Sequence, residues 1–405
     1  MTPYRLPRFL PLGNIAFALL FVTALGVNLS RGAERVDFDA LTRSGWQHFY
    51  SLEYDLALKD FERALEAHPD DAAAVNHVLD AVLYRELYKS NALDTRLYAK
   101  QGFIFSKQVS MDLGVKGRIK NLTERALSLS DDRLKSNPRD AEALYNRGIT
   151  EGLRSTYLVI VEHSWFGALR WGLSARHDHE QVLKLRPDMA DAKTVVGVHN
   201  FVVGSLTRPV RVMAGAAGIH GDKNKGLQML ADAGKAGGET STDARVALAL
   251  FMRREGRYQD AIEVVHTLTR DHPRNFLFAL EEGNLLLAAG KNSDAERSVR
   301  ELLNLCKRGK YPNVHFEMAY FTLGQALRAE GKLNEAFAAF DSAATSNTSP
   351  PDDRQRALLA AGEVSDLLAK RQDALLQYRA AIALNGSTEE AQLARKYLDK
   401  PYKGN

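Results

Sequence analysis

Apolar residues recur at spacings of three and four along most of the chain, which is typical of helices that bury one face. Proline interrupts the pattern at Pro69, Pro138, Pro187 and Pro273, each time after one apolar stripe and directly before another. Proline disfavours helical geometry at the preceding residue but is tolerated in the first turn of a helix. The recurring phrase therefore predicts a repeated helix-turn-helix unit.

Small residues also recur at fixed positions within windows of 34 residues. In residues 242–275, Ala249, Gly256 and Ala261 lie at offsets 8, 15 and 20, and Pro273 lies at offset 32. Offsets 8 and 20 again hold glycine and alanine in windows that begin at Phe38, Phe276 and Glu317, and offset 15 holds glycine in the last two. Small residues at offsets 8 and 20 let two helices lie close together, and glycine at offset 15 ends the first helix. A large residue at offset 24 fills the remaining space.

This spacing resembles the tetratricopeptide-repeat family over roughly residues 38–398. The resemblance implies an all-α fold, a right-handed helical solenoid of helix pairs. A narrower resemblance is carried by the run from Gly197 to Leu227. That run is similar to the signature stretch of the eukaryotic inclusion-body-clearance tetratricopeptide family associated with the mitochondrial outer membrane. This implies an adaptor-like role without chemistry.

Insertions set the two halves of the chain apart. Successive prolines in the N-terminal half lie farther apart than one window, and apolar periodicity continues between them, which predicts long helices. We expect four regions: a signal anchor or signal peptide at 1–31, an elaborated helical region at 32–240, regular repeats at 241–384, and a capping helix and tail at 385–405. Ser387 and Glu390 form a predicted capping box for that last helix, Glu389 to Leu398.

The first residues predict targeting to a membrane. Arg5 and Arg8 precede an apolar stretch over residues 9–29, which is long enough to span a bilayer. We expect a single-pass anchor with the N-terminus inside and the repeats on the extracytoplasmic or periplasmic side. The alternative is cleavage near Ala24 to Gly26 and secretion to the periplasm.

The composition argues against a nucleic-acid partner and against an internal disulfide framework. Lys and Arg number 54 against 50 Asp and Glu, and these charges are spread along the chain. The lack of a basic patch predicts no nucleic-acid partner. One cysteine, Cys306, excludes an internal disulfide framework. The sequence leaves the oligomeric state open.

Three motifs could carry chemistry, and each has a plainer interpretation. His177 and His179 lie two residues apart, which on a helix turns them in different directions, so we expect a solvated face and no metal. The stretch from Gly215 to Gly226 lacks the Gly-Lys-Ser/Thr ending of a phosphate loop, which favours a helix stop and a turn. Lys307 could lower the pKa of Cys306, although a core thiol is favoured. We predict no catalytic residue, no cofactor and no enzyme.

The remaining candidate is the concave face of the repeats, where offsets 2, 5, 9 and 12 of each first helix should point. The residues predicted to bind a peptide there are Arg253, Leu280, Asn284, Phe321, Gln325 and Arg328. Amides satisfy backbone groups and arginines meet carboxylates, so the set suits an extended or helical peptide.

Two functions therefore remain. The first is a non-enzymatic scaffold that binds a protein or peptide partner at or near a membrane. The alternative is a carrier or enzyme accessory protein, in which Trp165, Trp171 and Phe201 of the N-terminal half enclose a small apolar ligand.

Overall fold

The computed structural model describes residues 40–96 and 109–404, which form two compact units. Unit 1 comprises the described residues up to Phe49 together with Tyr54–Glu255, and unit 2 comprises Tyr50–Glu53 and the described residues from Gly256 onward. Helices and their connections make up all of these residues, and no strand occurs among them. The predicted all-α helical solenoid is confirmed. The predicted region boundaries at 240 and 384 stay predictions.

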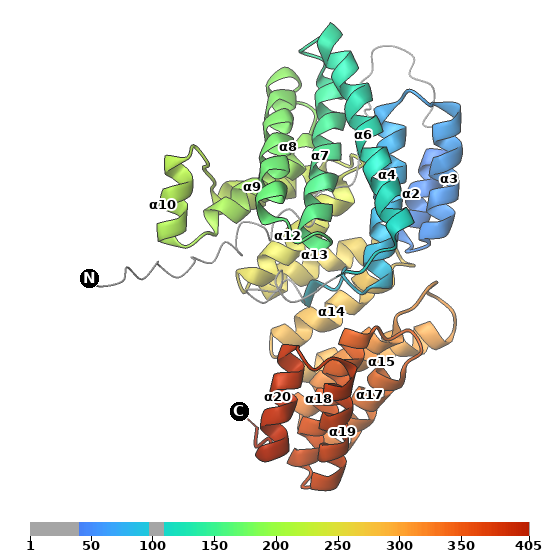
Figure 1. Cartoon of the computed structure of the whole chain (residues 1–405), viewed down its shortest axis with the longest axis vertical. Helices are drawn as coiled ribbons and strands as arrows, with labels where there is room; N and C mark the ends of the chain where they lie inside the picture. Colours follow the sequence, from blue (N-terminus) through green and yellow to red (C-terminus); the bar gives the residue numbers. More distant parts are fainter. Residues whose placement is uncertain (1–39, 97–108, 405) are drawn as a thin grey trace, which may run out of the picture. The chain divides into compact units, whose positions relative to one another are not determined.

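Each unit is a succession of helices joined by short turns (Figure 1). The helices of unit 1 are α2 (Ala40–Tyr50, whose last residue belongs to unit 2), α3 (Tyr54–Ala67), α4 (Ala72–Lys89), α6 (Leu113–Ser136), α7 (Ala141–Ile160), α8 (Trp165–Leu185), α9 (Ala192–Gly204), α10 (Arg208–Ala216), α11 (Lys223–Lys235) and α12 (Ser241–Arg254). Those of unit 2 are α13 (Tyr258–Asp271), α14 (Phe276–Ala288), α15 (Asn292–Lys307), α16 (Phe316–Ala329), α17 (Leu333–Thr345), α18 (Pro351–Leu367), α19 (Arg371–Leu384) and α20 (Glu389–Asp399).

At three of the four prolines, the next helix begins soon after the proline because a capping residue follows it. Asp71, Asp140 and Asn275 each lie two residues after a proline and are the N-caps of α4, α7 and α14. Their side-chain oxygens accept hydrogen bonds from backbone N–H groups of the first helical turn at 2.8–3.1 Å, which satisfies donors that the helix leaves unpaired. The turn at Pro187 differs, since α9 begins only at Ala192 and the side chain of its N-cap residue, Asp191, makes no capping hydrogen bond to α9.

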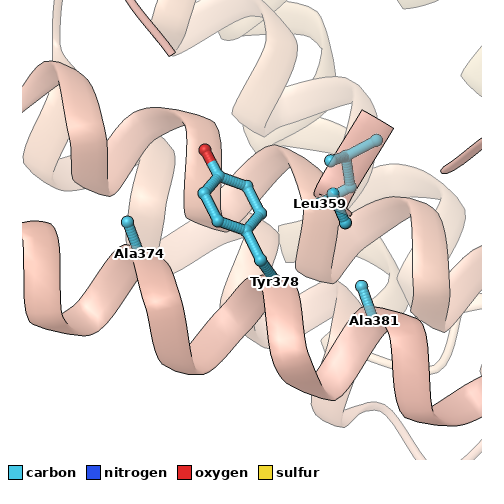
Figure 2. Packing of buried hydrophobic residues seen from close by; sticks show 5 residues of the cluster. Leu359, Ala374, Tyr378 and Ala381 are labelled. Carbon is cyan, nitrogen blue, oxygen red and sulfur yellow. The ribbon is translucent and has the colours of Figure 1, made fainter. Parts of the chain in front are cut away.

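Glycine at offset 8 lets a side chain of the second helix lie against the backbone of the first. A methyl group at Gly362 would lie 2.5 Å from Cε1 of Tyr378, and one at Gly324 would lie 2.7 Å from the ring of Phe340. Figure 2 shows Tyr378 on α19 between Ala374 and Ala381, with Leu359 of α18 nearby in the same buried cluster. The large residue at offset 24 thus fills the space beside the glycine at offset 8, as the sequence predicts.

Glycine at offset 15 ends the first helix in a left-handed backbone conformation. The φ values of Gly256, Gly290 and Gly331 are 72°, 73° and 75°. In the windows that begin at Phe38 and Gln355 the same position is taken by Leu52 and Ala369, with φ of 63° and 59°. A side chain in this conformation is strained, so these two repeats fold against a local preference.

Long helices dominate unit 1, as the periodicity predicts. Helices α6, α7 and α8 have 24, 20 and 21 residues. Helix α4 is buried on most of its circumference and packs against α3, α6 and α7. Within this interior, Asn76 donates to the Asn146 carbonyl at 3.0 Å and accepts from the Thr150 hydroxyl at 2.8 Å. Hydrogen bonds to the amide thus compensate for its burial.

The predicted cap of the last helix is wrong by one residue. Helix α20 begins at Glu389, and its N-cap is Thr388, whose hydroxyl accepts from the Ala391 N–H at 3.1 Å. The Ser387 hydroxyl instead donates to Asn385 at 2.8 Å.

The predicted localisation, a single-pass membrane protein with extracytoplasmic repeats, is wrong for the part of the chain that the structure describes. None of the helices between residues 40 and 96 or between 109 and 404 combines the length and apolar character needed to cross a bilayer. The stretch 9–29, on which the anchor, its cleavage and the membrane partner depended, lies outside the described residues.

Gly45→Ala tests the close contact between paired helices. We expect it to lower the free energy of unfolding of unit 1 by about 1–3 kcal/mol, since a methyl group there overlaps the Phe61 ring. All three tryptophans lie in unit 1, and Trp46 is 5.0 Å from Phe61, so tryptophan fluorescence reports the transition. Gly117→Ala in α6, with nothing within 4 Å, should instead be stabilising by about 0.5–1 kcal/mol. Equal stabilities for the two variants would contradict the packing argument.

Ala369→Gly tests the strain at offset 15. Relief of the left-handed conformation should stabilise the α18–α19 pair by about 1 kcal/mol, and Gly331→Ala should destabilise the α16–α17 pair by a similar amount. Native-state hydrogen exchange of amides in these helices measures both changes. Shifts of the same sign in the two variants would refute the explanation.

Candidate peptide-binding face

The first helices of successive pairs form an inner layer in unit 2. Helix α14 packs on α16, α16 on α18, and α18 on α20, while the second helices α15, α17 and α19 pack chiefly on the first helices. An array in which one set of helices comes closer together curves around that set. We call α14, α16, α18 and α20 the inner layer.

Two of the predicted peptide-binding residues lie inside unit 2. Leu280 is 1% exposed and Asn284 is 4% exposed. The Asn284 side chain accepts from the Thr322 hydroxyl at 2.9 Å and donates to Glu281 at 3.2 Å, which joins α14 to α16. In this structure both residues make inter-helix contacts and present little surface to a partner.

Three of the predicted residues lie together on α16 and are partly exposed. The Phe321 ring packs edge-on against Phe340 at 5.4 Å and lies 5.9 Å from the guanidinium of Arg356. Gln325 follows one turn later. Arg328 donates to Glu363 of α18 at 2.6 Å. These residues give the inner layer an aromatic, an amide and a cationic group on one helix.

The sixth predicted residue belongs to the other unit. Arg253, near the end of α12 in unit 1, donates to the Thr95 hydroxyl at 3.2 Å. The predicted set is therefore divided between the two units.

The inner layer holds a non-helical segment of this chain. Residues 400–404, here called the return segment, follow α20 and contain no helix. The Tyr402 N–H donates to the Asp366 carboxylate at 2.9 Å, and its hydroxyl accepts from Arg328 at 2.5 Å. The Asp366 carboxylate also accepts hydrogen bonds from the Arg371 guanidinium, at 2.9 Å, and from the Tyr378 hydroxyl, at 2.9 Å.

Sequence reasoning missed Glu363 and Asp366, although the signal was present. Offsets 2, 5, 9 and 12 of the window that begins at Gln355 are Arg356, Leu359, Glu363 and Asp366. The last two contact Arg328 and Tyr402. Tyr402 lies beyond all repeat windows, so no offset could have indicated it. Burial raises the pKa of the Glu363 carboxyl, and the charge and hydrogen bond of Arg328 oppose this.

The comparison with protein families supports the repeat assignment. The family model described as Tetratricopeptide repeat matches residues 42–94 and 246–313. These two stretches of the chain contain tetratricopeptide repeats. No curated protein matches the chain, and its membership of the eukaryotic inclusion-body-clearance family stays a prediction.

Solved structures of similar fold share little sequence with this chain. Pseudomonas aeruginosa pilF is 16% identical, covering 64% of this chain and 99% of its own, with a TM-score of 0.41. The human IFIT1 dimer with m7Gppp-AAAA is 13% identical, covering 96% and 86%, with a TM-score of 0.45. Yeast Tom70 is 13% identical, covering 89% and 94%, with a TM-score of 0.37. At this identity the likeness concerns the fold alone.

The predicted solvated face is wrong for His179, which is fully buried and packs between helices, whereas His177 is exposed. A methyl group at Gly148 of α7 would lie 2.5 Å from the His179 ring of α8, and Tyr145 packs edge-on against that ring at 5.2 Å. Burial lowers the pKa of His179 to about 4, so the imidazole is neutral at pH 7. Asp178 receives two hydrogen bonds from Arg147, at 2.6 and 2.9 Å.

The glycine-rich stretch serves close backbone packing between α9 and α11. A methyl group at Gly226 would lie 2.5 Å from the backbone nitrogen of Phe201, and one at Gly204 would lie 2.5 Å from that of Lys223. Gly218, with φ of 78°, follows α10, as the helix-stop interpretation predicts. Phe201 is fully buried and stacks on Phe251 at 4.0 Å, which makes it a core residue.

The single cysteine is a core thiol. Cys306 is buried, and burial raises its pKa to about 11. The suggestion that Lys307 could lower this pKa is therefore wrong.

One buried carboxyl in unit 1 has a strongly displaced pKa. Glu151 of α7 is 5% exposed, accepts from the Ser174 hydroxyl of α8 at 2.6 Å, and its second oxygen has no hydrogen-bond partner in the described structure. Burial, and secondarily the negative charges of Asp178 and Asp131, raises the pKa of Glu151 to about 7. The carboxyl is about half protonated at neutral pH.

This predicts a stability that falls as pH rises. Between about 4.5 and 7 the folded state binds the Glu151 proton more tightly than the unfolded state, so deprotonation destabilises unit 1 by on the order of 3 kcal/mol by pH 8. Glu151→Gln keeps an acceptor for Ser174 and removes the titration. Guanidinium unfolding followed by tryptophan fluorescence should show Glu151→Gln more stable than wild type at pH 8 and similar at pH 5. A pH-independent difference would contradict this.

Proposed function

We propose that the protein is a non-enzymatic interaction scaffold, and that the inner layer of unit 2 binds an extended peptide segment of a partner protein. The observation that carries the proposal is the return segment, a non-helical stretch held on α16 and α18 through both a side chain and a backbone N–H. Extended peptides bind grooves in this way, with backbone bonds for affinity and side-chain contacts for specificity.

The polar groups of this layer suit peptide binding. Arg328 and Glu363 form a pair at 2.6 Å on adjacent helices, and Asp366 is held between Arg371 and Tyr378. These side chains are fixed before a partner arrives, so little ordering entropy is lost on binding. Phe321 and Gln325, about two turns and about one turn before Arg328, supply an apolar contact and an amide for the partner's backbone.

Peptide selection followed by calorimetry tests the proposal. Peptides enriched from a displayed library on the whole protein should bind wild type and bind the variant Gln325→Ala with Arg328→Ala at least about tenfold more weakly, since a hydrogen bond to a charged group is worth about 1.5–3 kcal/mol. The matched control is Gln372→Ala with Arg300→Ala, which makes the same two changes on α19 and α15 of the same unit.

Circular dichroism must show that both double variants remain folded. Enriched peptides that bind the Gln325 and Arg328 variant as tightly as they bind the control variant would refute the binding face. So would the absence of any enriched peptide.

A further inference from the structure

The contacts of the return segment are concentrated on one residue. Tyr402 is 8% exposed, whereas Pro401 and Lys403 are exposed. Besides its two hydrogen bonds, the Tyr402 ring lies 5.1 Å from the Arg328 guanidinium and packs edge-on against Tyr397 at 5.3 Å. The phenol, its ring face and the adjacent backbone N–H are all recognised, while the flanking side chains are not.

The groups that receive Tyr402 are held by other parts of unit 2. Arg328 is fixed by Glu363, and the Asp366 side chain, 1% exposed, is fixed by Arg371 and Tyr378. Arg371 in turn donates to the Tyr397 and Leu398 carbonyls at 2.8 and 2.7 Å, which ends α20 beside the same site. The site is therefore built from α16, α18, α19 and α20, and its charged groups also bond one another besides Tyr402.

The charges of this site are balanced. Two arginines, Arg328 and Arg371, face two carboxylates, Glu363 and Asp366. An added anion would meet as much negative as positive charge and would lose its hydration. A neutral phenol needs one donor for its oxygen and a cation over its ring, both of which Arg328 supplies.

We infer that this site is a receptor for an extended segment of a partner protein that presents an unmodified tyrosine, and that the return segment competes for it within the same chain. The inference rests on the proposed function and names the class of peptide that the inner layer takes.

The return segment is suited to displacement. Only its first residue makes a helical hydrogen bond, from the Lys400 N–H to the Lys396 carbonyl, and one buried side chain must offset the conformational entropy lost by the ordered residues around it. Such a segment exchanges between bound and open states, and the apparent affinity for an outside peptide is reduced by the fraction of open molecules. Replacing Tyr402 should therefore raise the apparent affinity for an outside peptide.

Binding of a peptide with the sequence of residues 399–404, blocked at both ends and carrying a fluorine label, tests this by NMR line broadening, which detects millimolar affinities. We expect the full-length variant Tyr402→Ala to bind the peptide at least tenfold more tightly than wild type does. A peptide with phenylalanine in place of the tyrosine should bind this variant more weakly, and a phosphotyrosine peptide more weakly still.

Arg328 provides the specificity control. With Arg328→Ala added to Tyr402→Ala, the tyrosine and phenylalanine peptides should bind equally, because the donor to the phenol is gone. The milder change Tyr402→Phe, which keeps the ring, should raise peptide affinity by less than Tyr402→Ala does, and it keeps the test valid if the alanine variant is poorly folded.

Equal peptide binding by wild type and Tyr402→Ala, or tighter binding of the phosphotyrosine peptide, would overturn the inference. Suppose that the peptide of residues 399–404 does not bind Tyr402→Ala, but library-selected peptides still lose affinity when Gln325 and Arg328 are replaced. The tyrosine receptor is then refuted, and the binding face stands. Failure of the selected peptides removes the proposed function itself.

Discussion

A glycine or alanine at offset 8 of the first helix in each repeat window is the constraint on which the rest of the structure depends. At Gly45, Gly324 and Gly362 the backbone of the first helix is open, and a ring from the second helix lies against it. A side chain larger than a methyl group there would push the helices apart by a distance that close-packed interiors do not tolerate. The short separation within each pair then brings successive first helices into contact, and that contact creates the inner layer.

The same constraint explains residues that otherwise suggest chemistry. In the elongated pair α7–α8, Gly148 faces His179 in place of an aromatic ring. The imidazole is buried, its Nδ1 lies 2.8 Å from the Ala175 carbonyl, and its low pKa follows from burial. A histidine that fills a packing position has the sequence signature of a ligand without the access that a ligand needs.

The sequence predicts the helix pairs well and the surface less well. Offsets of small and large residues indicate which helices touch, because each contact lies within one window. They do not reveal that Leu280 and Asn284 are enclosed by the next pair, since burial depends on how tightly neighbouring pairs stack. Tyr402 could not be predicted, because its contacts join a segment outside the repeats to side chains more than thirty positions earlier.

Buried amides at the interfaces between first helices have a consequence for how such an array can change. Asn76 bonds Thr150 in unit 1 as Asn284 bonds Thr322 in unit 2, and each threonine also bonds a carbonyl of its own helix. Apolar interfaces accept many partners, but the side-chain oxygen of each amide accepts its hydrogen bond from the threonine of the neighbouring first helix. At these two junctions a helix pair cannot be deleted or exchanged without stranding a polar group, so the amides constrain the order of the modules there.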